Sequence, residues 1–219
     1  MAKDNSTGYE YKPVPKDTTE YALAAMKEKY GEEFQAIGPW GSVLGKDWKL
    51  LLSCESLPDQ EILVVVENYR DTDTRSIRDN YLACLYAQET EAFLRSCAEE
   101  TIGSANVSYL PSLVPLDASL PASLPFDRFL SESGVFISAM IEVKASDFQS
   151  EEQARALIER IAESGVECNL NIIGVSDLAF GSLTEDDLKD RSASGQYSLY
   201  ALAYCKDGAI ELSVKEGTQ

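Results

Sequence analysis

No histidine occurs among the 219 residues of this chain. The chain therefore lacks the side chain that most often transfers protons near neutral pH and most often binds transition metals in proteins. This absence excludes catalysis by a histidine base and excludes metal sites built on imidazole ligands.

Cysteine is present, but it is poorly spaced for a disulfide framework or a zinc site. No two of the five cysteines form a C-x-x-C pair, and their odd number leaves at least one thiol without a partner cysteine. We expect most of them to be small buried side chains in a reducing compartment, although spacing alone leaves one disulfide open. The cysteines are Cys54, Cys84, Cys97, Cys168 and Cys205.

Basic residues are few, because 19 Lys and Arg stand against 37 Asp and Glu, for a formal net charge of -18. The excess is spread evenly: residues 1–100 hold 19 acids and 11 bases (net -8), and residues 101–219 hold 18 acids and 8 bases (net -10). Direct binding to DNA or RNA is disfavoured, since phosphate contacts need clustered Lys and Arg. The even spread indicates solubility through mutual repulsion. The alternative is an acidic surface that imitates nucleic acid and inhibits a basic partner.

Long apolar runs are also absent. The chain has no uninterrupted apolar run of about 18 residues, the length from which a membrane-crossing helix is inferred. Residues 1–16 lack the apolar segment of a signal peptide and are predicted to be a flexible N-terminal segment. We expect a cytoplasmic protein, and the alternative is a protein tethered at the cell surface whose N-terminal signal has been removed.

Residues 17–104 carry the pattern of an N-terminal α+β subdomain. Asp17 or Thr18 is placed to cap a helix whose apolar residues repeat at helical spacing as far as Tyr30. Three extended segments and a long helix follow, which predicts the order α-β-β-β-α. The predicted elements are helix 17–30, strands 34–37, 48–54 and 62–66, and helix 77–99.

Residues 105–134 are predicted to connect two subdomains. The stretch contains Pro111, Pro115, Pro121 and Pro125, which interrupt any long helix or central strand. Its leucines Leu110, Leu113, Leu116, Leu120 and Leu124 argue against a free linker. We therefore expect this proline-rich connection to lie packed on the surface.

Residues 135–219 predict a C-terminal α+β subdomain in the order β-α-β-α-β-β. Ser150 and Gln153 form a capping box at the start of a helix, and Asp207-Gly208 supplies the turn of a terminal hairpin. The two halves together predict an α+β fold. Its architecture is two small α/β sandwich subdomains with mostly antiparallel sheets.

Two segments look like ligand-binding loops but fail the requirements of those loops. Gly41–Asp47 resembles a phosphate-binding loop, yet it is one residue short, ends in Asp instead of Ser or Thr, and precedes a strand. Asp71 and Asp73 suggest a calcium loop, but the central glycine and the final glutamate are missing. Cys97 has acidic neighbours that oppose its use as a nucleophile. We therefore assign no catalytic, cofactor-binding or metal-binding residue.

Three residues are of the types enriched at the centres of protein interfaces. Trp40 lies in a glycine-bounded turn, and Tyr69 and Arg70 lie where a predicted strand meets a polar loop. Trp40, Tyr69 and Arg70 are thus the candidate partner-contact residues. Packing at a turn is the alternative role for them.

The segment Tyr21–Phe34 and the segment Arg78–Leu82 together carry a family resemblance. They are similar to a helix-turn-strand opening in uncharacterised small proteins of Gram-positive bacteria, some of which are lipoproteins. The resemblance covers about the first hundred residues and implies neither a reaction nor catalytic residues. The sequence has no lipid-anchor cysteine near its start.

A complete core without a catalytic motif predicts a non-enzymatic binding or interaction module with an acidic surface. Its expected partner is another protein, and the sequence assigns no cofactor. Two alternatives are the nucleic-acid mimic described above and a hydrolase that uses two carboxylates without histidine. The oligomeric state stays open.

Overall fold

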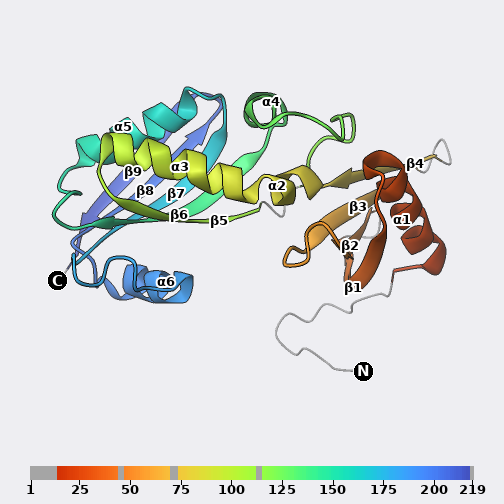
Figure 1. Cartoon of the computed structure of the whole chain (residues 1–219), viewed down its shortest axis with the longest axis horizontal. Helices are drawn as coiled ribbons and strands as arrows, with labels where there is room; N and C mark the ends of the chain where they lie inside the picture. Colours follow the sequence, from red (N-terminus) through yellow and green to blue (C-terminus); the bar gives the residue numbers. More distant parts are fainter. Residues whose placement is uncertain (1–13, 44–46, 70–73, 112–114, 218–219) are drawn as a thin grey trace. The chain divides into compact units, whose positions relative to one another are not determined.

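The computed structural model confirms the predicted α+β fold, with helices and two mostly antiparallel sheets (Figure 1). The structure describes residues 14–43, 47–69, 74–111 and 115–217. The elements are α1 (Lys16–Tyr30), β1 (Phe34–Val43), β2 (Asp47–Cys54), β3 (Ile62–Tyr69), β4 (Thr74–Asp79), α2 (Tyr81–Leu85), α3 (Ala87–Thr101), β5 (Ala105–Leu110), α4 (Phe126–Glu132), β6 (Phe136–Lys144), α5 (Glu151–Ala162), β7 (Glu167–Val175), α6 (Glu185–Ser194), β8 (Leu199–Lys206) and β9 (Ala209–Glu216).

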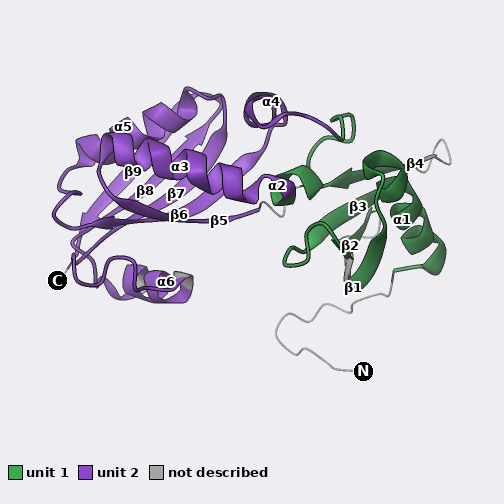
Figure 2. Ribbon diagram, viewed as in Figure 1, with its two compact units in different colours: residues 1–84, 115–122 green, residues 85–114, 123–219 purple. Residues whose placement is uncertain are grey.

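The chain divides into two compact units, which Figure 2 colours separately. The sequence predicts that the helix now seen as α3 belongs to the first subdomain, whereas the structure groups it with unit 2. Unit 1 is Met1–Cys84 with Pro115–Ala122, and unit 2 is Leu85–Val114 with Ser123–Gln219.

Unit 1 is built on a four-stranded antiparallel sheet in the order β1-β2-β3-β4, against which α1 packs. Strand β3 is central and buried on both faces, as its uninterrupted apolar run from Ile62 to Val66 predicts. The backbone N–H of Leu116 donates to the carbonyl oxygen of Asp79 at 2.7 Å. This bond fastens part of the proline-rich segment to β4, which explains why that segment belongs to unit 1.

Strand β4 corrects the prediction of one long helix over residues 77–99. The structure places Thr74–Asp79 beside β3, then a short α2 and a separate α3. Central strand β3 needs a neighbour on each side to satisfy its backbone groups, and β4 supplies the second one. Asn80 then ends the strand, since its side-chain oxygen accepts from the backbone N–H of Leu63 at 2.8 Å. The predicted order α-β-β-β-α therefore lacked one strand.

The start of α1 also differs from the prediction. The helix begins at Lys16 with Pro15 in the capping position, and no side chain caps it. Asp17 lies in the first turn instead and pairs with Arg75 of β4 at 2.7 Å. Proline is favourable at the start of a helix because a backbone N–H at this position has no acceptor within the helix.

Unit 2 is built on a five-stranded sheet in the order β5-β6-β7-β8-β9, in which only the pair β6–β7 is parallel. Figure 1 shows α3 and α5 on one face of this sheet and α6 on the other. The predicted order β-α-β-α-β-β over residues 135–219 is confirmed. So are the capping box of Ser150 and Gln153 and the turn at Asp207-Gly208, where both residues have positive φ.

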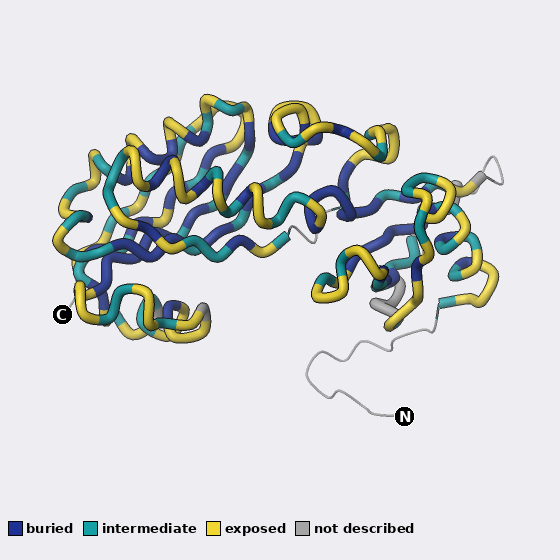
Figure 3. Tube along the Cα trace, viewed as in Figure 1, coloured by how far each residue is buried: buried dark blue, intermediate teal, exposed yellow. Residues whose placement is uncertain are grey.

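The core of unit 2 lies between the sheet and α3 and α5 (Figure 3). In β6 the buried Ile137, Ala139 and Ile141 alternate with residues that are half exposed on the opposite face. Helix α5 contributes an apolar stripe from Ala154 to Ile161. The sheet face toward α3 and α5 is thus buried along β6, β7 and β8, and the other face keeps polar side chains in reach of solvent.

Thr90 of α3 provides a test of this core. Its hydroxyl is buried and has no hydrogen-bond partner among the described residues. Replacing Thr90 by valine removes a desolvated polar group at nearly constant volume, so we expect the free energy of unfolding of unit 2 to rise by about 1 kcal/mol. Hydrogen exchange of the β6 and β7 amides measures the change.

The matched control for Thr90 is Thr101→Val in the same helix. The hydroxyl of Thr101 donates to the carbonyl oxygen of Cys97 at 2.8 Å. Its removal should bring no gain in exchange protection. Equal effects of the two substitutions would contradict the explanation.

Candidate functional site

The predicted partner-contact residues lie in or beside unit 1. Trp40 is in β1 and Tyr69 is the last residue of β3, but their side chains are outside what the structure describes. Arg70 lies outside the described residues altogether. Their role as contacts therefore stays a prediction.

The loops that resemble ligand sites give no candidate centre. Gly41 is in β1 and Asp47 begins β2, with residues 44–46 between them outside the described part. Asp71 and Asp73 are also outside it. Within the described ranges, no group of three or more Cys, Asp or Glu side chains is placed to hold a metal ion.

All five cysteines are buried and none forms a disulfide. Burial is the main reason that the pKa of Cys97 lies above its ordinary value; Arg160 nearby acts in the opposite direction, and Glu100 adds to the rise. From the sequence, only the acidic neighbours of Cys97 are named as a cause of the raised pKa. A thiol with a raised pKa is a poor nucleophile, as the sequence predicts.

Unit 1 contains a cluster of buried polar groups around Asp79, whose side chain is 2% exposed. Its carboxylate accepts from Lys29 Nζ at 3.0 Å, from the Tyr30 hydroxyl at 2.7 Å and from the backbone N–H of Tyr81 at 3.0 Å. Burial, with the nearby Asp79 charge as a second cause, raises the pKa of Tyr30 above its ordinary value. These three donors hold the carboxylate within the unit, so we assign the cluster a stabilising role in unit 1.

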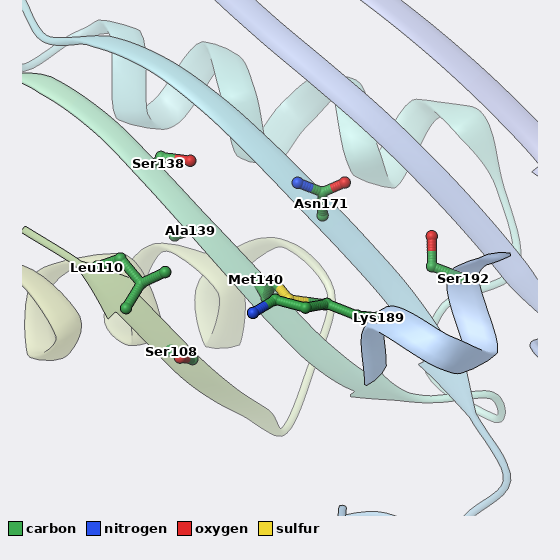
Figure 4. Close-up of a pocket in the computed structure, with 8 residues that line it drawn as sticks. All are labelled: Ser108, Leu110, Ser138, Ala139, Met140, Asn171, Lys189 and Ser192. Atoms are coloured by element: carbon green, nitrogen blue, oxygen red, sulfur yellow. The ribbon is translucent and has the colours of Figure 1, made fainter. Parts of the chain in front are cut away.

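The candidate site lies in unit 2, on the sheet face that carries α6, which we call the α6 face. A pocket of about 290 Å³ opens there beside the helix. Figure 4 shows its lining side chains from β5, β6, β7 and α6. They are Ser108, Leu110, Ser138, Ala139, Met140, Asn171, Lys189 and Ser192.

Strand register brings the sheet part of this lining together. Ser108 is opposite Met140 across β5 and β6, and Met140 is opposite Asn171 across β6 and β7. Leu110 and Ser138 are opposite each other one step along. Because side chains alternate between the faces of a sheet, all five project toward the α6 face.

Helix α6 covers only one end of this face. Its buried Leu188 packs with Ile173 and Val175 of β7 and with Tyr197, while Met140 at the pocket borders the same cluster. The burial pattern of β7 changes accordingly, from alternating to continuous near its end. The pocket therefore lies where the cover of α6 stops.

A buried carboxylate holds the loop that leads into α6. Glu142 is buried on β6, and its oxygens accept from Asn106 Nδ2 at 2.8 Å and from the backbone N–H of Gly181 at 3.2 Å. These bonds tie the loop before α6 to β5 and β6. They fix the start of α6 and, through it, the position of Lys189 and Ser192.

Asn171 has a set orientation in the pocket wall. The Tyr200 hydroxyl donates to its Oδ1 at 2.6 Å, from the neighbouring strand β8. In Figure 4 the nitrogen of Asn171 lies on the side of Ser138 and the oxygen on the other side. The amide N–H groups are thus the part of Asn171 that faces the pocket.

Lys189 supplies the cation of the pocket. Figure 4 shows its side chain running from α6 over Met140 toward β5. The side chain is 52% exposed and lies 3.7 Å from Asp186 in its own helix. The lining within the described residues contains no carboxylate, which sets this spot apart on a chain of net charge -18.

Sequence reasoning missed every residue of this pocket. One signal was available: Asn169 and Asn171 are the polar positions in the alternation of β7, and asparagine is depleted in strands. Ser108 and Lys189 gave no such signal. They belong to an edge strand and to a polar helix, and only the fold brings them together.

Comparison with known proteins identifies no family for the chain. No family model matches it, and no curated protein matches it. Among solved structures, it is similar to the crystal structure of a DUF5037 family protein from Ruminococcus gnavus ATCC 29149, with a TM-score of 0.44 and 14% identity over 89% of this chain and 93% of that one. A likeness this distant carries no argument about function. The predicted resemblance to Gram-positive lipoproteins stays a prediction.

Proposed function

We propose that the protein is a non-enzymatic binding module and that unit 2 binds a small polar ligand in the pocket beside α6. The observation that carries the proposal is the composition of that pocket. Hydroxyl groups, one amide and one ammonium converge on an open cavity, with apolar contact from Leu110 and Met140. Concave sites with a mostly apolar wall and a few convergent polar groups are the usual form of ligand pockets.

The size of the pocket limits the ligand. A volume of about 290 Å³ is at the lower end of the range for small-molecule sites. A small molecule fills such a space better than a ligand the size of a nucleotide does. The ligand is therefore a small metabolite or the end of a longer chain.

Binding is favoured over catalysis by the state of Lys189. A serine in this lining needs a base to become a nucleophile, and a lysine base works when it is buried away from water. Lys189 is half exposed and has Asp186 nearby. The lining also lacks the facing pair of carboxylates that a histidine-free hydrolase uses.

The wider expectations from the sequence remain proposals beside this one. They are a protein partner, a cytoplasmic location and, as the alternative function, imitation of nucleic acid by the acidic surface. No helix in the described part of the chain has the length and apolar character to cross a membrane.

Ligand-observed NMR tests the proposal with a set of small carboxylates, neutral amides, monosaccharides and nucleotides at millimolar concentration. Ser138→Tyr places a ring in the pocket and should weaken binding of any true ligand at least about tenfold. The matched control is Ser213→Tyr in β9, which is exposed on the same sheet face outside the pocket. Binding that Ser213→Tyr keeps and Ser138→Tyr loses is the expected result.

Two results would overturn the proposal. One is the absence of any compound whose binding depends on the pocket. The other is the steady conversion of a bound compound into product, which would make the protein an enzyme.

A further inference from the structure

The orientation of Asn171 decides what kind of group the pocket accepts. A separation of 2.6 Å between the Tyr200 hydroxyl and Asn171 is typical of an O–H···O bond and shorter than an ordinary N–H···O bond. The atom that meets Tyr200 is therefore the amide oxygen. The tyrosine hydroxyl occupies that oxygen and leaves the N–H groups of Asn171 for the pocket.

The pocket is consequently rich in donors. Asn171 contributes N–H groups, Lys189 contributes an ammonium that also lies 3.7 Å from Asp186, and serine hydroxyls both donate and accept. None of the described residues that line the pocket carries a carboxylate. A ligand that offers several acceptor lone pairs and a negative charge complements this arrangement.

The charges of the pocket and of the whole chain favour a ligand with a single negative charge. Sites for phosphate dianions commonly use several cations or a set of backbone N–H groups at a helix N-terminus. This lining has Lys189 as its one cation, in a chain of net charge -18 that repels anions. A second negative charge on the ligand adds repulsion without adding a partner.

The remaining wall is apolar and fixes the other end of the ligand. Leu110 is 55% exposed at the pocket, and Met140 lies under the Lys189 side chain. A short hydrocarbon chain covers these two side chains when the charged end meets Asn171 and Lys189. The volume leaves room for a few carbon atoms.

We propose that the pocket binds the carboxylate group of a small monocarboxylic acid, to which Asn171 and Lys189 donate hydrogen bonds. Tyr200 is the positioning residue that turns the Asn171 N–H groups inward. This proposal rests on the proposed function, because it names the ligand class of the same site. The carboxylate comes from a free acid or from the C-terminus of a short peptide. Both offer the same group to the same donors.

The experiment compares butanoate with butanamide and propylphosphonate, which carry the same propyl chain. Butanoate is expected to bind with a dissociation constant of about a millimolar, as its few atoms allow. The amide and the phosphonate should bind at least about tenfold more weakly, because one lacks the charge and the other carries more of it. The side-chain amide signals of Asn171 in a ¹⁵N spectrum should move on addition of butanoate.

Variants then test the role of each residue. Asn171→Asp and Lys189→Gln should each weaken butanoate binding by about tenfold or more, since each removes donors to the carboxylate. Tyr200→Phe keeps the ring but frees the amide to turn, so butanoate binding should weaken about threefold to tenfold while butanamide binding stays unchanged. The matched control, Tyr204→Phe, removes a hydroxyl from the same strand outside the lining and should change neither.

Acetyl-alanyl-alanine and its C-terminal amide separate the two sources of carboxylate. Tighter binding of the free-acid peptide than of butanoate identifies a peptide terminus, and the reverse identifies a free acid. Two outcomes overturn the carboxylate proposal and leave the binding function standing. One is that butanamide binds as tightly as butanoate or more tightly. The other is that Tyr200→Phe prefers butanoate over butanamide as strongly as the wild type does. A pocket that binds none of these probes or of the wider compound set overturns both.

Discussion

Replacing Asp79 by alanine is expected to lower the free energy of unfolding of unit 1 by about 3–5 kcal/mol. The substitution leaves Lys29, whose side chain is only 18% exposed, without its carboxylate, and it leaves the Tyr30 hydroxyl without an acceptor. An uncompensated buried charge costs more than the intact pair contributes, which is why the loss is large. Urea denaturation followed by tryptophan fluorescence measures it, because both tryptophans, Trp40 and Trp48, belong to unit 1.

Two further variants separate this explanation from a general effect of losing a carboxylate. Asp17→Ala breaks the pair with Arg75 at the exposed start of α1 and should leave the denaturation midpoint nearly unchanged. Lys29→Met combined with Asp79→Asn removes the cation together with the anion and should cost less than Asp79→Ala alone. If the double variant were the least stable of the three, the buried-charge argument would be wrong.

Asp79 also shows what the sequence could not reveal about unit 1. Periodicity alone favours a helix, because Leu82, Leu85 and Tyr86 are spaced three and four residues apart, as on one helical face. The strand forms instead because Asp79, a residue disfavoured in strands, finds Lys29 and Tyr30 across from it. Those partners lie about fifty residues away in sequence, and no local pattern contains them.

In unit 2 the local signals and the fold agree, so the sequence predicts the elements well. The capping box at Ser150, the Asp207-Gly208 turn and the alternation in β6 each act within a few residues. The pocket is different, because it depends on which strands become neighbours. Asn171 meets Tyr200 and Ser108 meets Met140 only after the order β5-β6-β7-β8 is fixed.

Strongly alkaline solution is expected to lower the free energy of unfolding of unit 1 by more than the titration of its surface groups would. Burial raises the pKa of the Cys84 thiol to about 12, and burial with Glu32 nearby raises the pKa of Tyr81 to about 12. Burial likewise raises the pKa of Tyr30. In the unfolded chain the pKa values of these groups return to about 9 for the thiol and about 10 for the tyrosines.

The sign of the effect follows from these raised pKa values. Below pH 9 both folded and unfolded chains keep the three protons, and the full stability of unit 1 is present. Between pH 9 and 12 the unfolded chain releases protons that the folded chain still holds, so the free energy of unfolding falls as pH rises. Each group contributes about 1.4 kcal/mol per pH unit inside its window. Cys84 and Tyr81 together account for a loss of about 4 kcal/mol between pH 8 and pH 11, and Tyr30 adds about 1.4 kcal/mol.

Urea denaturation monitored by tryptophan fluorescence at pH 8, 9, 10 and 11 measures this loss in unit 1. Cys84→Ala removes the group whose window opens at the lowest pH, so the stability of this variant at pH 8 should fall slightly while its dependence on pH becomes distinctly shallower. Cys205→Ala, a buried thiol of unit 2, is the matched control and should leave the pH dependence of the tryptophan signal unchanged. A wild-type curve that is flat up to pH 11 would show that water reaches the Cys84 thiol and the two tyrosine hydroxyls in the folded protein.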